Sequence, residues 1–227
     1  SIKDAALILV KPQYQAQLPK LRHAILSGKL LMDPDNNIHE YNLIPYTDPK
    51  RPQFHFTSRK NWINDPNGMI YHEGEYHLYL QHNPYGTAWG NMTWGHAIST
   101  DCIHWKQIRH GLFPEEHGPN GTIFSGNMMR DSRNTLGYGD NALVACYTVA
   151  VNGGDYYQSI AVSVNNGRSF INTHDVVVPN LGYSSGERDP YLFYYEPTNM
   201  YVILLWVANR TAVVLNSQNM INWTIVS

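Results

Sequence analysis

The residue best suited to chemistry in this chain is Asp65, which lies in the heptapeptide Trp62–Gly68. Pro66 fixes its own backbone and disfavours the α region at the preceding residue, and Asn67-Gly68 is typical of tight turns. The pattern predicts a stiff polar turn that holds the Asp65 carboxylate in place. Nucleophilic attack needs a positioned carboxylate, but an ordinary hairpin turn is the alternative for the same residues.

Three further clusters combine polar and aromatic residues of the kind that binds sugars, because amides bond to hydroxyls and aromatic faces cover C–H patches. Asp189 precedes a proline, as Asp65 does, and both Asp-Pro pairs fall near the start of a predicted sheet. Two carboxylates facing one funnel are what glycoside hydrolysis requires. Each cluster taken singly also suits a polar loop at a sheet edge. The clusters are residues 81–84 with 89–96, residues 124–126, and residues 186–190.

Short strands separated by turns fill residues 51–227, which we predict to be one all-β domain. The alternation of Tyr76, Leu78 and Leu80 predicts a half-buried strand. Residues 1–50 differ, with near-helical apolar spacing over 17–31 and then a polar linker. They are interpreted as an N-terminal extension, either an arm packed on the main domain or a separate module. The predicted strands are 68–72, 76–81, 93–99, 124–129, 143–149, 157–163, 190–195, 201–207 and 212–215.

An imperfect repeat occurs at residues 97–105, 161–170 and 214–223. Each copy has a small or apolar strand end, a serine, an Asp or Asn two residues later, and then an aromatic residue. Recurrence at about the size of a four-stranded sheet is typical of a β-propeller. A β-sandwich is the alternative, but it is not expected to repeat such a segment.

Composition and charge argue against several function classes. The formal net charge is −2 and no basic run occurs, which argues against a nucleic-acid partner. No apolar run approaches the roughly 18 residues that cross a bilayer, so no membrane partner is expected. The chain begins at Ser1 without the charged region of an intact signal peptide. Asn-x-Ser/Thr sequons nevertheless suggest a secreted glycoprotein, and they start at Asn91, Asn120, Asn209 and Asn222.

Cysteine, histidine and serine patterns give no sign of a cofactor. Cys102 and Cys146 lie in apolar, strand-like surroundings, which predicts two buried thiols. Ser125 has no His/Asp partner arrangement, so acyl transfer is not expected. Six histidines lie in one region without the spacing of a ligand pair, so no metal site is predicted; they are His72, His77, His82, His96, His104 and His110.

Together, these motifs make residues 51–227 resemble the N-terminal part of glycoside hydrolase family 32. That family includes invertases, inulinases, levanases and fructan exohydrolases. The resemblance implies a five-bladed β-propeller followed by a sandwich, of which this chain would supply about three blades. It also implies action on sucrose, fructo-oligosaccharides or fructans without a cofactor; assembly into a homo-oligomer is left open.

The resemblance assigns roles position by position. Asp65 resembles the nucleophile that forms a fructosyl-enzyme intermediate, and Asp189 the transition-state stabiliser. Arg188 would orient Asp189 and contact the sugar. The remaining pocket residues implied are Asn64, Gln81, Trp89, Ser125, Trp62 and Phe124.

One departure from the family pattern concerns the acid/base. The family places this glutamate in a Glu-Cys motif after Arg-Asp-Pro, and no Glu-Cys pair occurs in this chain. Glu187 is the nearest carboxyl, but on a strand it should point away from Arg188. We therefore expect a retaining fructosyl hydrolase, or the N-terminal part of one, that is not a complete catalyst alone. A fructosyltransferase on the same fold and a non-catalytic fructan-binding propeller are the alternatives.

Overall fold

The computed structural model describes residues 47–52, 54–118 and 121–227, apart from the side chains of residues 174 and 175. The predicted helix within 17–31 lies outside the described residues. The rest is nearly all β-structure, as predicted, and forms three four-stranded antiparallel sheets. Two short elements interrupt them, the helix α3 (Pro114–His117) and the 3-10 helix η3 (Glu196–Thr198). No helix among the described residues is long and apolar enough to cross a membrane.

The first sheet contains β1 (Ile63–His72), β2 (Glu75–His82), β3 (Thr93–Ser99) and β4 (Lys106–Leu112), paired in that order. Tyr76, Leu78 and Leu80, whose alternation predicted a half-buried strand, lie on the less buried of the two faces of β2. His77 and Tyr79 on the other face are completely buried. A polar face is tolerated there because the second sheet packs over it and the Tyr79 hydroxyl donates to the Gly167 carbonyl at 2.8 Å.

The second sheet contains β5 (Gly121–Arg130), β6 (Leu143–Val151), β7 (Tyr157–Ser163) and β8 (Ile171–Val178). β6 is an apolar run that is buried almost throughout, because it is an inner strand of a sheet covered on both faces.

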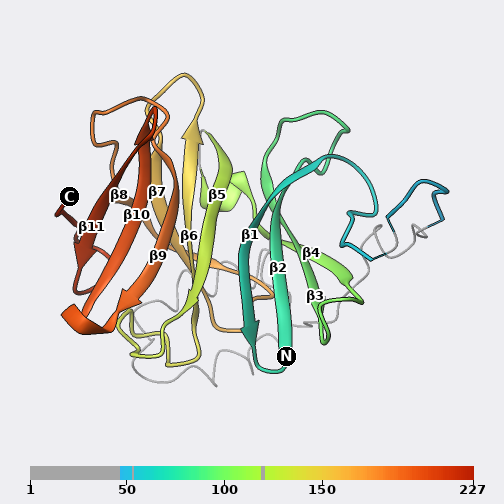
Figure 1. Cartoon of the computed structure of the whole chain (residues 1–227), viewed down its shortest axis with the longest axis horizontal. Coiled ribbons are helices and arrows are strands. Elements are labelled where there is room, and N and C mark those ends of the chain that lie inside the picture. Colours follow the sequence, from blue (N-terminus) through green and yellow to red (C-terminus); the bar gives the residue numbers. More distant parts are fainter. Residues whose placement is uncertain (1–46, 53, 119–120) are drawn as a thin grey trace, which may run out of the picture.

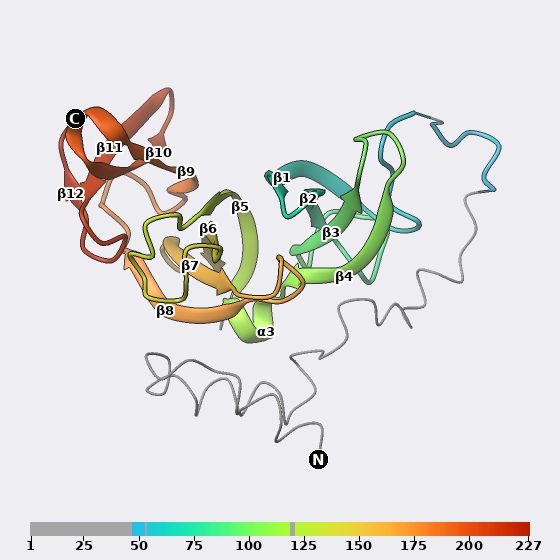
Figure 2. The same cartoon turned by 90° about the horizontal axis from the view of Figure 1, so that it is seen from below.

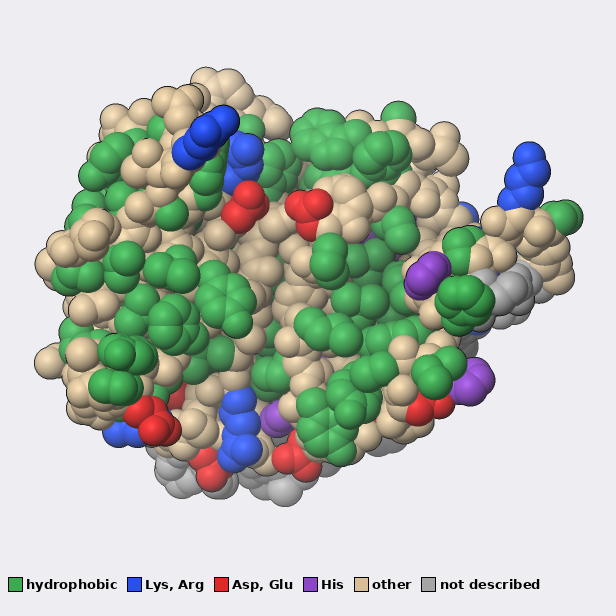
Figure 3. Space-filling model, viewed as in Figure 1, with side chains coloured by type: hydrophobic (Ala, Val, Ile, Leu, Met, Phe, Trp, Pro, Cys, Tyr) green, Lys and Arg blue, Asp and Glu red, His purple; other side chains and the backbone are tan. Residues whose placement is uncertain are grey.

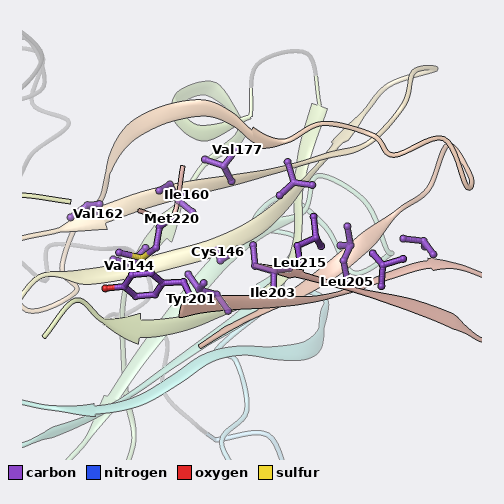
Figure 4. Packing of buried hydrophobic residues seen from close by; sticks show 14 of the residues in the cluster. Val144, Cys146, Ile160, Val162, Val177, Tyr201, Ile203, Leu205, Leu215 and Met220 are labelled. Carbon is purple, nitrogen blue, oxygen red and sulfur yellow. The ribbon is translucent and has the colours of Figure 1, made fainter. Parts of the chain in front are cut away.

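The third sheet contains β9 (Arg188–Tyr195), β10 (Met200–Ala208), β11 (Thr211–Ser217) and β12 (Thr224–Ile225). Apolar side chains from β6, β7 and β8 interlock with those of β10 and β11 to form the larger core cluster. Figure 4 shows Val144, Cys146 and Ile160 from the second sheet facing Ile203 and Leu205 from the third. A second cluster joins the second sheet to the first.

The three sheets stand side by side in chain order (Figure 1). Seen from below, they form an arc in which β1, β5 and β9 lie toward the inside and β4, β8 and β12 toward the outside (Figure 2). β5 contacts both β1 and β9. Four-stranded sheets arranged radially with their first strands innermost are characteristic of a β-propeller. The number of blades in a complete propeller stays a prediction.

The imperfect repeat is a structural unit. In every sheet it forms the turn between the third and fourth strands. Ser99 donates to Asp101 Oδ1 at 3.0 Å, Ser163 to Asn165 Oδ1 at 2.9 Å, and Ser217 to Asn219 Oδ1 at 3.1 Å. The same serine oxygens accept backbone N–H groups of the turn, which is why Ser and Asp or Asn recur at this spacing.

The two cysteines have different environments. Cys146 is buried in β6, and burial raises the pKa of its thiol, as expected for a core residue. The prediction for Cys102 was wrong, because it lies exposed in the β3–β4 turn with φ of 62°. The apolar residues around it in sequence belong to that turn rather than to a strand.

Candidate active site

The candidate residues of β1, β5 and β9 lie in the first half of each strand. Each position coincides with an irregularity in strand pairing. The register shifts between Ile63 and Pro66 in β1, between Ile123 and Gly126 in β5, and between Leu204 and Trp206 in β10, opposite the start of β9. Bulges of this kind redirect side chains out of the regular pleat.

The heptapeptide around Asp65 is not a turn between strands, contrary to the prediction. It forms most of the first half of β1. Because β1 is an edge strand, the missing N–H of Pro66 removes no hydrogen bond between two inner strands of the sheet. Gly68 has φ of +52°, and a Cβ there would lie 2.9 Å from the Tyr79 ring. The turn-forming residues therefore produce two bulges within one strand, and Asp65 lies in the first.

The Asp65 carboxylate is held by a residue from another sheet. Ser125 Oγ donates to Asp65 Oδ2 at 2.8 Å, which joins β5 to β1. The Asp65 side chain is otherwise exposed. One oxygen is thus fixed by the hydroxyl, and the face that meets solvent is free for a ligand.

Asp189 lies at the start of β9 with φ of 63°, an unusual conformation for a residue other than glycine. A buried polar chain supports its backbone. Asp189 N–H donates to Thr148 Oγ1 at 3.0 Å, and the Thr148 hydroxyl donates to Gln158 Oε1 at 2.6 Å. The Gln158 amide then donates to the Glu187 carbonyl at 3.1 Å. This network maintains the conformation that presents the Asp189 carboxylate.

The charge of Asp65 acts on the Asp189 carboxylate. Burial raises the pKa of Asp189, the Arg188 guanidinium opposes that rise, and the nearby Asp65 charge adds to it. The structure therefore brings Asp65 and Asp189 from two different sheets close enough for the charge of one to act on the other. Charged side chains are sparse on the face of Figure 3, where hydrophobic groups predominate.

Arg188 contacts its neighbour as expected. Its Nε lies 3.6 Å from Asp189 Oδ2, and its Nη1 donates to the Gly186 carbonyl at 3.0 Å. The guanidinium carbon lies 4.1 Å from the centroid of the Trp206 ring, which fixes the plane of the side chain. Trp206 was not identified from the sequence, where it is one aromatic residue in an apolar strand.

Aromatic side chains flank the carboxylates. Trp62 is partly exposed and donates from Nε1 to Asn64 Oδ1 at 2.8 Å. Trp89 is 59% exposed and contacts Phe124 edge-to-face with ring centroids 5.9 Å apart. Phe124 in turn meets Tyr156 at 5.5 Å. Tyr156 is a second residue that the sequence did not single out, because it lies in a loop without a motif.

Gln81 has a different environment from the one expected. It is only 2% exposed. With the Asn67 amide oriented to match donors with acceptors, the Asn67 oxygen accepts from Gln81 Nε2 at 3.0 Å and from Trp94 Nε1 at 3.2 Å. Gln81 therefore supports β1 from beneath, two residues beyond Asp65, and its contact with a sugar stays a prediction.

Glu187 is completely buried. Its Oε2 accepts from the Leu181 N–H at 2.6 Å, and its Oε1 accepts from Tyr183 N–H at 2.8 Å and Ser184 N–H at 3.4 Å. Glu187 precedes β9 instead of lying on a strand, and its carboxylate binds the backbone of its own loop. Its carboxylate organises the loop that precedes β9.

The histidines form buried pairs within the first sheet. His77 Nδ1 lies 3.0 Å from His96 Nε2, and His82 Nδ1 lies 2.7 Å from His110 Nε2. Burial lowers the pKa of His77 to about 4 and that of His96 well below the ordinary value. In the described part of the chain, no group of three or more His, Cys, Asp or Glu side chains is arranged to hold a metal ion.

The chain is similar to known proteins over most of its length. The chain is 42% identical over 186 residues to the levanase of Bacillus subtilis (strain 168), a match that covers 80% of this chain and 27% of the levanase. It is 35% identical over 215 residues to an extracellular exo-inulinase of Aspergillus ficuum, covering 83% and 39% of the two chains. The chain thus spans well under half the length of these relatives.

Solved structures show the same fold. The exo-inulinase of Aspergillus awamori superposes with a TM-score of 0.74 at 33% identity, covering 81% of this chain and 40% of that one. A β-fructofuranosidase from Schwanniomyces occidentalis, complexed with fructosyl-erythritol, gives a TM-score of 0.70 at 34% identity, covering 78% and 36%. The description "Glycosyl hydrolases family 32 N-terminal domain" matches residues 55–227. With its propeller-type sheets and paired carboxylates, the chain belongs to glycosyl hydrolase family 32.

Proposed function

We propose that this chain carries the nucleophile and the transition-state stabiliser of a retaining glycosidase that releases terminal fructosyl units from sucrose or fructans. The proposal rests on one observation: Asp65 and Asp189 come from separate sheets and lie close enough to interact electrostatically. Ser125, from the sheet between them, holds Asp65 by a hydrogen bond. The levanase, exo-inulinase and fructofuranosidase relatives support the substrate class.

In this reaction Asp65 attacks the anomeric carbon of the fructosyl unit. The bond to the leaving sugar's oxygen breaks, and that oxygen takes a proton from an acid. Water then attacks the same anomeric carbon and gives its proton to the same acid/base residue, while the bond from that carbon to the Asp65 carboxylate breaks. Fructose leaves with retained configuration and Asp65 is regenerated. Asp189 accepts bonds from fructose hydroxyls that strengthen as positive charge develops on the ring, and Arg188 holds Asp189 in place.

The acid/base is a separate element of the proposal. In retaining glycosidases it lies about 5–5.5 Å from the nucleophile. Glu187 does not fit this role, because both of its oxygens accept backbone N–H groups in a buried loop. We propose a glutamate in a Glu-Cys segment instead, as the family resemblance implies.

Replacement of the nucleophile tests the proposal. In a protein that also carries the Glu-Cys segment, Asp65→Asn should leave sucrose binding largely intact by calorimetry and abolish fructose release, because it keeps the shape and removes the attacking group. Asp189→Ala should reduce the rate more than the affinity, by roughly a few kcal/mol in activation free energy. NMR of the first fructose anomer formed reports retention or inversion.

The control is Asp140→Asn, which changes an exposed carboxylate in the β5–β6 connection. Near-normal turnover in Asp65→Asn would refute the assignment of the nucleophile. Accumulation of kestose at high sucrose would identify transfer to sugar instead of hydrolysis. Sugar binding without turnover in a protein that also carries the Glu-Cys segment would favour the non-catalytic alternative.

A further inference from the structure

Trp206 of β10 lies directly beside Arg188 of β9, because the two residues pair across the strands. The guanidinium carbon of Arg188 lies 4.1 Å from the centroid of the indole ring. The indole Nε1 donates to the Asn209 carbonyl at 3.1 Å, so the turn between β10 and β11 fixes the position of the ring. Arg188 therefore rests on an aromatic surface that the third sheet itself holds in place.

This arrangement keeps the guanidinium at a distance from the neighbouring carboxylate. Arg188 Nε lies 3.6 Å from Asp189 Oδ2, which is longer than the roughly 2.7–2.9 Å of a charge-assisted hydrogen bond. Arginine commonly forms two such bonds to a nearby carboxylate. Here Nη1 donates to the Gly186 carbonyl at 3.0 Å instead, and the guanidinium lies over the Trp206 ring. The ring and the carbonyl together prevent Arg188 from closing on Asp189.

The Asp189 oxygens stay open as a result. Within the described part of the chain the Asp189 carboxylate accepts no hydrogen bond, and its side chain is 48% exposed. Coulomb attraction falls only as the inverse of distance, so between about 2.8 Å and 3.6 Å it weakens by about a fifth, whereas the hydrogen bond is lost. The Arg188 charge can therefore stabilise the ionised carboxylate without occupying the sites that accept hydroxyl groups.

We propose that Trp206 is a positioning residue that holds Arg188 away from Asp189, so that the carboxylate keeps its acceptor sites open for fructose hydroxyls. The inference rests on the proposed function, in which Asp189 binds those hydroxyls. Arginine has a long flexible stem and five N–H donors, so without the ring it closes on Asp189 and a sugar has to displace it. The charged groups that act on Asp189 are Arg188 from its own strand and Asp65 from β1.

Sucrose affinity measured against pH tests this role without turnover. Calorimetry is carried out in an Asp65→Asn background, in which binding is lost at acidic pH as Asp189 gains a proton. Adding Trp206→Leu should weaken sucrose binding at neutral pH about tenfold, because the sugar then competes with a charge-assisted hydrogen bond. The loss of binding should move to lower pH, because a bonded arginine favours the ionised carboxylate. Adding Arg188→Leu should move it to higher pH.

Two further variants separate positioning from stability. Trp206→Phe keeps an aromatic ring, so its affinity and its pH dependence should stay near those of the background protein. Trp223→Leu is the matched control, because the Trp223 indole also donates to a turn carbonyl, that of Met220 at 3.1 Å, but packs against the core cluster. It should not move the pH dependence. A shift to higher pH or no shift in Trp206→Leu, or an equal shift in Trp223→Leu, would overturn the proposal.

A titration without sugar separates this inference from the hydrolase proposal. Carbon-13 NMR of the Asp189 carboxyl group should show its pKa falling in Trp206→Leu and rising in Arg188→Leu, and Trp206→Met serves if the leucine variant does not fold. If these shifts occur but no fructose is released by a protein that also carries the Glu-Cys segment, the hydrolase proposal fails and the role of Trp206 stands. Fructose release with an Asp189 pKa that Trp206→Leu leaves unchanged would reject the role of Trp206 alone.

Discussion

Replacement of Glu187 by glutamine distinguishes a structural carboxylate from a catalytic one. Glu187 is the carboxyl nearest in sequence to the Arg-Asp-Pro motif, so it competes for the acid/base role. In the structure its two oxygens accept the N–H groups of Leu181, Tyr183 and Ser184, and the side chain is completely buried. We expect Glu187→Gln to destabilise the fold and to leave the catalytic pH profile unchanged.

The magnitude follows from these contacts. Glutamine replaces one oxygen by an NH₂ group, which removes a charge-assisted hydrogen bond worth about 1.5–3 kcal/mol. It also places a buried donor against a backbone donor, which costs about 1–3 kcal/mol. The free energy of unfolding should fall by about 3–5 kcal/mol. For a protein of this size about 2–4 °C of Tm corresponds to each kcal/mol, so Tm should fall by about 10 °C.

Scanning calorimetry gives Tm, and fructose release well below Tm, by a protein that also carries the Glu-Cys segment, gives kcat/KM against pH. Glu196→Gln is the matched control, because that side chain is exposed in η3. An unchanged Tm together with loss of turnover and of the basic limb of the pH profile would refute the structural role. It would make Glu187 the proton donor.

Two other substitutions and one thiol reagent give further tests. Arg188→Leu removes the cation that lowers the pKa of Asp189, so that pKa should rise. On the acidic limb of the kcat/KM profile, Asp189 gains a proton and stops accepting bonds from hydroxyls. This limb should therefore move to higher pH. A pH profile that does not move would contradict this coupling. Gly126→Ala would place a Cβ 1.9 Å from the Cys146 carbonyl oxygen, so it should cost several kcal/mol of stability or prevent folding, as measured by urea denaturation. A thiol reagent should modify Cys102 rapidly and Cys146 only after unfolding, and two fast thiols in the native protein would contradict the burial of Cys146.

The sequence predicted the strands that have a strong apolar signal. The prediction at 143–149 lies within β6, and that at 157–163 coincides with β7. The fourth strands β4, β8 and β12 were not predicted. They lie at sheet edges, are short or mixed in polarity, and form because an inner strand supplies hydrogen-bond partners, which is information from outside the segment.

The sequence allowed us to predict which motifs belong to the site, but not which of their side chains contact one another. Asp65, Ser125 and Asp189 were selected by residue type and by resemblance. The bond from Ser125 to Asp65 depends on how β5 packs against β1, which no local pattern encodes. Trp206 and Tyr156 gave no signal, because each is one aromatic side chain in a chain that is 12% aromatic.

The packing between sheets has a consequence for evolution and engineering. Asp65 belongs to the first sheet and Asp189 to the third, so no single sheet determines how far apart they stand. The second sheet lies between them, and interlocked core side chains such as Cys146 from the second sheet and Ile203 and Leu205 from the third set the spacing of these two sheets. Adding or removing one methylene in this core changes the distance between two carboxylates that do not contact the core. Reaction selectivity in such a protein can therefore be adjusted from its interior while every residue that meets the sugar stays the same.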